Sequence, residues 1–163
     1  TKLINTFEKK YEERWMSMMR KKLGLQGTDD KDKFLIVDLL TWMHQNKVDY
    51  TNTFCYLMDL KEYDDDIYKD NDFQNWKKNW RERLRLNDNN PEKYISLMRT
   101  VNPLVIPRNN KVEKALEFAE KGDYSFLKKI ISILKEPYKL SQDKLDYQNP
   151  GPQQKNYQTF CGT

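Results

Sequence analysis

The sequence predicts an all-α protein with about seven helices in one helical domain, followed by an extended C-terminal tail. Apolar residues recur at spacings of three and four along most of the chain, which is the period of an amphipathic helix. The 163 residues include only five glycines and six prolines, so a turn-dense all-β fold is not expected. No run of alternating apolar and polar residues favours a strand.

Apolar stripes and typical helix ends define the first three predicted helices. The stripe of the first helix consists of Ile4, Phe7, Tyr11, Trp15 and Met18, and Gly24 is its expected C-cap. Oxygens of residues 28–30 can begin the second helix. Its apolar residues are Phe34, Leu35, Ile36, Val37, Leu39, Leu40, Trp42 and Met43, so this helix should be central. Asp49 or Thr51 can begin a short third helix that carries Phe54, Leu57 and Leu60.

Four further helices follow the acidic stretch 61–70, which has no apolar period and is expected to be a loop. The fourth helix carries the stripe Phe73, Trp76, Trp80 and Leu84. Asn90-Pro91 is an N-cap followed by proline at the first helical position, and it begins the fifth helix. The sixth helix ends at Lys121-Gly122, and Asp123 can cap the seventh, which ends before Pro137. We therefore predict a helical domain over residues 1–135 and a Pro- and Gln-containing tail over residues 136–163.

Charge is unevenly distributed, although the net charge is only +4. Residues 59–72 carry seven carboxylates and two lysines, whereas residues 76–86 carry five basic residues and one glutamate. Basic residues interleaved with Trp76 and Trp80 are one theme of nucleic-acid binding. The tryptophans share an apolar face with Phe73 and Leu84, however, so we expect them in the core and do not expect nucleic-acid binding.

Sequence motifs for chemistry are lacking, and we assign no catalytic, cofactor-binding or metal-binding residue in this chain. The glycines fit neither of the common phosphate-binding loops. A calcium loop that begins at Asp64 would need glycine where Lys69 stands and glutamate where Asn75 stands. His44 has no recognisable nucleophile partner and is expected to be structural or exposed. One histidine and two cysteines are too few for a structural zinc site.

We expect neither a membrane span nor a signal peptide in this sequence. No apolar run is long enough to cross a membrane, so no membrane partner is expected, and the N-terminus lacks the apolar segment of a signal peptide. Two cysteines outside any CxxC pair fit a reducing, intracellular setting. Because the chain begins without methionine, apparently inside an element, we expect it to be a piece of a longer protein.

Several segments resemble the SelO family, and they occur in the order found in that family. Residues 102–109 and 119–123 are similar to its NP-x-x-I-x-RN and A-x-x-GD block. Residues 19–25 resemble its M-R-x-K-L-G-L helix end, and residues 80–84 its W-x-x-R-[YL] element. Residues 39–54 resemble its LL-x-x-M … D-[FY]-T-x-[TA]-F segment. Cys161, third from the end, matches a terminal position that holds selenocysteine or cysteine in family members.

The resemblance implies a function for the longer protein. SelO proteins resemble protein kinases but are AMPylating pseudokinases, which bind ATP with Mg²⁺ and transfer AMP to Ser, Thr or Tyr of proteins. Their nucleotide-binding and metal-binding residues lie upstream of the matched region. This chain would therefore be the C-terminal helical region of such a nucleotidyltransferase, structural or regulatory and not catalytic alone. The parent would be cytoplasmic in a bacterium and mitochondrial in a eukaryote.

Two candidate sites rest on the same resemblance. Cys161 is a candidate redox or regulatory residue that would pair with a thiol of the catalytic part. Asn102, Pro103, Arg108 and Asn109 are candidates for a brace against the upstream kinase-like domain, in which Arg108 would bind a carboxylate with two hydrogen bonds. The expected partners are thus that domain and the parent's protein substrates, and the chain alone is expected to self-associate. The alternative is a free-standing helical interaction module that uses residues 59–72 or 76–86.

Overall fold

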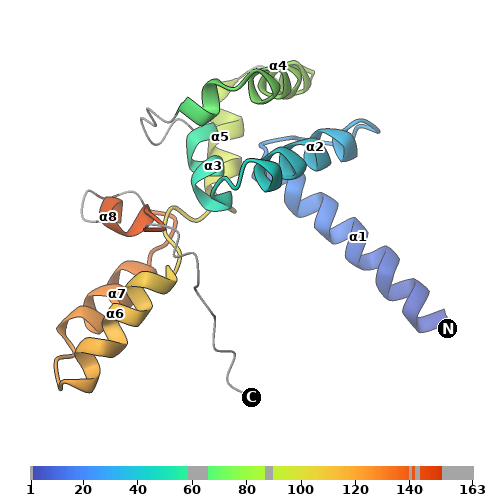
Figure 1. Cartoon of the computed structure of the whole chain (residues 1–163). Helices are drawn as coiled ribbons and strands as arrows, with labels where there is room; N and C mark the ends of the chain where they lie inside the picture. The colour runs from blue at the N-terminus through green and yellow to red at the C-terminus, as the bar shows by residue number, and fades with distance from the viewer. Residues whose placement is uncertain (1, 59–65, 87–89, 140, 142–143, 152–163) are drawn as a thin grey trace. The chain divides into compact units, whose positions relative to one another are not determined.

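The computed structural model describes residues 2–58, 66–86, 90–139, 141 and 144–151, and every regular element among them is helical (Figure 1). This confirms the predicted all-α class. None of the described helices has both the length and the apolar character that a membrane span needs. The chain divides into two compact units, Thr1–Pro103 and Leu104–Thr163. The predicted division at residue 135 stays a prediction.

The first unit contains five α-helices and one short 3-10 helix in its described part. They are α1 (Lys2–Lys22), α2 (Asp32–Gln45), α3 (Tyr50–Leu57), η1 (Asp66–Lys69), α4 (Asn71–Arg85) and α5 (Pro91–Arg99). Gly24 ends α1 with φ of 70°, in the left-handed region. Asp49 caps α3 by accepting a hydrogen bond from Asn52 N at 2.8 Å, and Asn90 caps α5 by accepting one from Glu92 N at 3.0 Å. These three helix ends were predicted from sequence and are confirmed.

Helices α2 and α4 run antiparallel and form the centre of the first unit. The beginning of α2 meets the end of α4 at Asp32 and Arg83, and its end meets the beginning of α4 at Trp42 and Phe73. The apolar stripe predicted for α4 is buried throughout. The indole N–H groups of its two tryptophans donate to backbone carbonyls, that of Trp76 to Leu35 and that of Trp80 to Leu23. These rings belong to the core, which leaves no base-stacking surface there.

Helix α1 forms as predicted, but its predicted apolar stripe does not pack on the first unit. Phe7, Tyr11 and Met18 are exposed, and the side chains of residues 2–5 lie outside the described ones. Met16 and Met19 are buried instead. The periodicity identified the helix correctly, but it could not show which face the neighbouring helices cover.

The second unit is built on a helical hairpin. Its helices are α6 (Asn109–Glu120), α7 (Ser125–Leu134) and the short α8 (Leu145–Gln148). As predicted, α6 ends before Gly122, whose φ is 82°. The N-cap of α7 is Tyr124 and not the predicted Asp123, whose carboxylate lies one residue earlier and accepts a hydrogen bond from Ser125 N at 2.8 Å. Helix α8 lies where we predicted an extended tail. Four residues are only about one helical turn, which is too short for an apolar period to appear in the sequence.

Candidate functional site

Asn102, the first predicted brace residue, joins the end of α1 to the end of α5 within the first unit. Its side chain is buried, its Nδ2 donates to the Lys22 carbonyl at 2.9 Å, and its Oδ1 accepts from Lys22 Nζ at 2.8 Å. The Lys22 ammonium also lies 4.5 Å from the centre of the Phe54 ring. Burial lowers the pKa of Lys22 from its usual 10.5, while the nearby Cys55 thiol acts in the opposite direction. Asn102 therefore binds a half-buried cation of its own unit.

The other three brace candidates are placed differently. Pro103 ends the first unit, and its carbonyl lies 4.0 Å from the buried Cys55 Sγ. Arg108 is buried in the second unit, where one of its terminal nitrogens donates to the Gln148 carbonyl at 2.8 Å and so anchors α8. Asn109 begins α6 and is exposed. A role for these residues against another domain stays a prediction. Cys161 lies outside the described residues.

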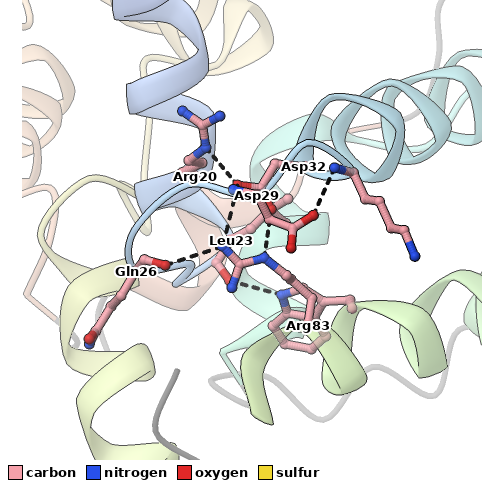
Figure 2. A network of polar contacts seen from close by, with 8 residues as sticks. Arg20, Leu23, Gln26, Asp29, Asp32 and Arg83 are labelled. Carbon is pink, nitrogen blue, oxygen red and sulfur yellow. Dashed lines mark hydrogen bonds and ion pairs between the residues drawn. The ribbon is translucent and has the colours of Figure 1, made fainter. Parts of the chain in front are cut away.

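The sequence did not predict the main polar network of the first unit, which surrounds the carboxylate of Asp32 (Figure 2). Arg83 Nε donates to Asp32 Oδ1 at 2.7 Å, and Arg20 Nε donates to Oδ2 at 2.7 Å. The backbone N–H of Asp29 adds a hydrogen bond to Oδ2 at 3.0 Å. Arg83 also reaches the Gln26 carbonyl at 3.2 Å. One carboxylate thus joins α1, α2, α4 and the loop between α1 and α2.

The Asp32 carboxylate is held in its charged form. Its side chain is fully enclosed, and that of Arg83 is only 8% exposed. Burial alone would raise the pKa of Asp32, but hydrogen bonds from Arg83, Arg20 and the Asp29 amide outweigh it. The pKa therefore lies below its ordinary value of 3.8. A carboxylate with this many donors is a structural junction and is not poised to act as a general acid or base.

A groove runs along the seam between α2 and α4, and Asp32 and Arg83 of this network are among the residues that line it. Its volume is about 730 Å³, and the exposed apolar side chains Phe34 and Leu86 line it. Besides the buried Asp32–Arg83 pair, the charged residues that line the groove are three carboxylates and one exposed lysine: Asp29, Asp38, Glu82 and Lys31. A second hollow of about 260 Å³ shares two of its lining residues with this groove, so the depression continues along the seam. An apolar groove with acidic edges can bind a basic amphipathic segment.

Metal ions in proteins are typically held by clusters of side chains that can ligate them, such as His, Cys, Asp and Glu. Among the described residues, no group of three or more of these side chains lies close enough to hold a metal ion. The one carboxylate buried among these residues, that of Asp32, already accepts hydrogen bonds from two arginines. We therefore derive no chemical step through a metal ion in this part of the protein.

The sequence contained one signal for the Asp32 network. Arg20 and Arg83 both belong to the segments that resemble SelO, but the sequence says nothing of what these arginines bind. Asp32 is 12 residues from Arg20 and 51 from Arg83, and no motif spans these separations. The network therefore became visible only when the helices were placed.

Comparison with known proteins gives consistent matches over this chain. The family model described as protein adenylyltransferase SelO matches residues 1–135. A protein nucleotidyltransferase YdiU of Pelagibacter ubique is 46% identical, over 100% of this chain and 34% of the relative. Relatives with the same description in Nitrosococcus oceani and Bacillus mycoides are 40% and 41% identical, each over 98% of this chain and 33% of its own length. The chain thus spans about a third of the length of these curated relatives.

Proposed function

The chain belongs to the SelO family, and from this premise we propose that it is the C-terminal helical region of a protein adenylyltransferase. The parent would be an AMPylating pseudokinase that transfers AMP from ATP to Ser, Thr or Tyr side chains of other proteins. The match of the family model over residues 1–135 carries this proposal. Three of the relatives are bacterial nucleotidyltransferases, and we expect a related parent to work in the bacterial cytoplasm.

The proposed role of this chain is structural and regulatory. The single buried carboxylate among the described residues joins three helices and is neutralised by two arginines. Lys22 and Asn102 join the ends of α1 and α5. These contacts give the first unit a fixed arrangement of helices, which suits a support for a catalytic domain. ATP and Mg²⁺ would be held by the part of the parent that lies outside this chain.

Label transfer from ATP tests the proposed chemistry. The protein for this test is the P. ubique relative with its matching third replaced by this chain, which we call the chimera. Transfer to protein of label from the α-phosphate but not from the γ-phosphate is expected, because AMP retains only the α-phosphate. Label from the γ-phosphate would indicate a kinase and would refute the proposal. The 163-residue chain alone should transfer neither label.

A regulatory role for Cys161 extends this proposal. Its thiol and a thiol of the catalytic part would form a disulfide, and their two electrons and two protons would pass to oxidised glutathione, which would be reduced to two molecules of glutathione. The chimera should then transfer AMP at different rates under oxidising and reducing conditions. Cys161→Ser should make the two rates equal. A wild-type chimera with equal rates under both conditions would exclude this role.

The groove between α2 and α4 favours a second candidate function, that of a helical interaction module. Its acidic edges at Asp38 and Glu82 predict binding of a cationic amphipathic peptide, which can be tested with a helical peptide of leucine and lysine. Fluorescence anisotropy should show saturable binding that weakens in salt and in Asp38→Asn/Glu82→Gln. Binding unaffected by that double substitution would exclude the groove as the binding site.

A further inference from the structure

Helix α1 presents an exposed aromatic stripe to solvent. Phe7 is 71% exposed, Tyr11 is 62% exposed and Met18 is 47% exposed, while Trp15 is half-buried. We call these four residues the α1 stripe. Together with Lys10 and Arg14 they line a shallow hollow of about 500 Å³. Large apolar side chains that gather on one helix face typically mark a surface that another molecule or domain covers.

The first unit does not use this face of α1. The helix packs on its own unit through Met16 and Met19, which are both buried. Glu12 also faces that unit, since its carboxylate accepts a hydrogen bond from Lys33 of α2 at 2.6 Å. On a helical wheel Phe7, Tyr11 and Met18 lie on a different side from Met16, and the half-buried Trp15 lies at the border with Met19. The α1 stripe is therefore available to something other than the described neighbours.

The N-terminal half of α1 also has little support within its own unit. Every described side chain from residue 6 to residue 14 is exposed. Figure 1 shows this half of α1 extending beyond α2 within the first unit. In proteins most of the stability of a helix comes from packing of its apolar face. The described neighbours bury no described side chain of residues 6–14, so an occupant of the stripe would add to the stability of this 21-residue helix.

We propose that the α1 stripe docks this chain onto the remaining two-thirds of a SelO polypeptide. This inference deepens the proposed function and rests on it. The P. ubique relative continues for about two-thirds of its length beyond the region matched, since the chain covers only 34% of it. Lys10 and Arg14 lie within the stripe, so the surface that covers it should be apolar with carboxylates at its edge. Asn102, by contrast, turns its side chain inward to Lys22. The α1 stripe is therefore a better docking surface than the region around Asn102.

Amide hydrogen exchange tests this docking in the chimera and in the chain alone. Burial of the stripe should slow exchange over residues 7–18 by roughly tenfold or more in the chimera, because exchange then requires opening of the interface. Equal exchange rates in the two proteins would overturn the proposal. Protection of residues 7–18 in the chimera that rises with protein concentration would assign the stripe to a second copy, which would also overturn the proposal.

Matched tyrosine variants separate docking from general stability. Tyr11→Ser should leave the unfolding midpoint of the chain alone unchanged and lower that of the chimera by several degrees. Tyr138→Ser is the control, because Tyr138 is 49% exposed, follows the end of α7 and lies outside the stripe. Equal effects of the two substitutions in the chimera would contradict stripe docking. A chimera with protected α1 but no AMP transfer would support docking and refute the proposed activity, so the two failures can be told apart.

Discussion

Asp32→Asn tests whether the buried carboxylate holds the first unit together. The substitution keeps the shape of the side chain but removes its charge, and it places an amide N–H group among donors. Arg83 would then remain only 8% exposed, without the charge that it contacts at 2.7 Å. Removing one partner of a buried ion pair costs about 3–5 kcal/mol. That is a large part of the roughly 5–15 kcal/mol that stabilises a typical domain, so we expect marked destabilisation.

Urea unfolding followed by tryptophan fluorescence measures this loss of stability in the first unit. All four tryptophans lie in the first unit, so their signal reports its unfolding and not that of α6 and α7. Glu12→Gln is the matched control. Its ion pair with Lys33 is as short, at 2.6 Å, but both side chains are more than half exposed. Such exposed pairs contribute little, and the control midpoint should not move.

A double-mutant cycle decides whether the loss comes from the contact itself. Arg83→Gln and Asp32→Asn should each destabilise the unit. The double variant should lose less free energy of unfolding than the two single variants lose together, and the difference, the coupling energy, should be about 1–3 kcal/mol. Additive effects, or a loss below about 1 kcal/mol in Asp32→Asn, would refute the view that this network is the main junction of the unit.

The pH dependence of stability gives a second test of Asp32. Its pKa is lower in the folded protein than the ordinary 3.8. The stabilisation that Asp32 contributes is therefore complete above its unfolded pKa of about 3.9, and it is lost as the pH falls through the lower folded pKa. Stability of the wild-type chain should fall in acid more steeply than that of Asp32→Asn. Equal slopes would show that Asp32 is not held in its charged form.

Two further substitutions test helix ends in the first unit. Gly24→Ala should lower the free energy of unfolding more than Gly27→Ala does. Both glycines have positive φ, but only Gly24 is closely packed: a Cβ there would lie 2.9 Å from Tyr94 Cβ, whereas a Cβ at Gly27 meets no atom within 4 Å. Gly27→Ala is the control, because it has only the cost of a left-handed backbone, about 1–2 kcal/mol. Equal urea midpoints for the two variants would contradict the close packing at Gly24. Asp49→Ala should cost about 1 kcal/mol because Asn52 N loses its cap acceptor, and an unchanged midpoint would show that the cap contributes nothing.

Helix positions could be predicted from the sequence because their signals are local. Asn90-Pro91, Asp49 and Gly24 each set a helix end through backbone geometry or through a hydrogen bond a few residues away. The spacing of Phe73, Trp76, Trp80 and Leu84 identified both a helix and its buried face, because α4 is covered by its own unit. Acidic and basic runs, by contrast, did not identify a site, and residues 59–65 lie outside the described ones.

What the sequence could not predict depends on partners that are distant in the chain or outside it. The same periodicity that placed the α4 stripe in the core also picked out Phe7 and Tyr11, which are exposed. An apolar stripe indicates that a helix has a face suited to burial, but it does not identify the element or molecule that covers this face. Asn102 was a candidate for a contact with another domain, which stays a prediction, and the sequence did not indicate that its side chain binds Lys22, 80 residues away. Such pairings follow from the tertiary arrangement and have no local sequence signal.

Intact-mass spectrometry after incubation with ATP and Mg²⁺ tests the central claim most directly. The sample is a generic protein substrate exposed to the chimera, and in parallel to the 163-residue chain alone. We expect the added mass of AMP with the chimera and no added mass with the chain, because we propose that the other two-thirds of the polypeptide carries out the chemistry. AMP addition by the chain alone would contradict the non-catalytic role. A chimera that adds no AMP under both oxidising and reducing conditions would contradict the proposed activity.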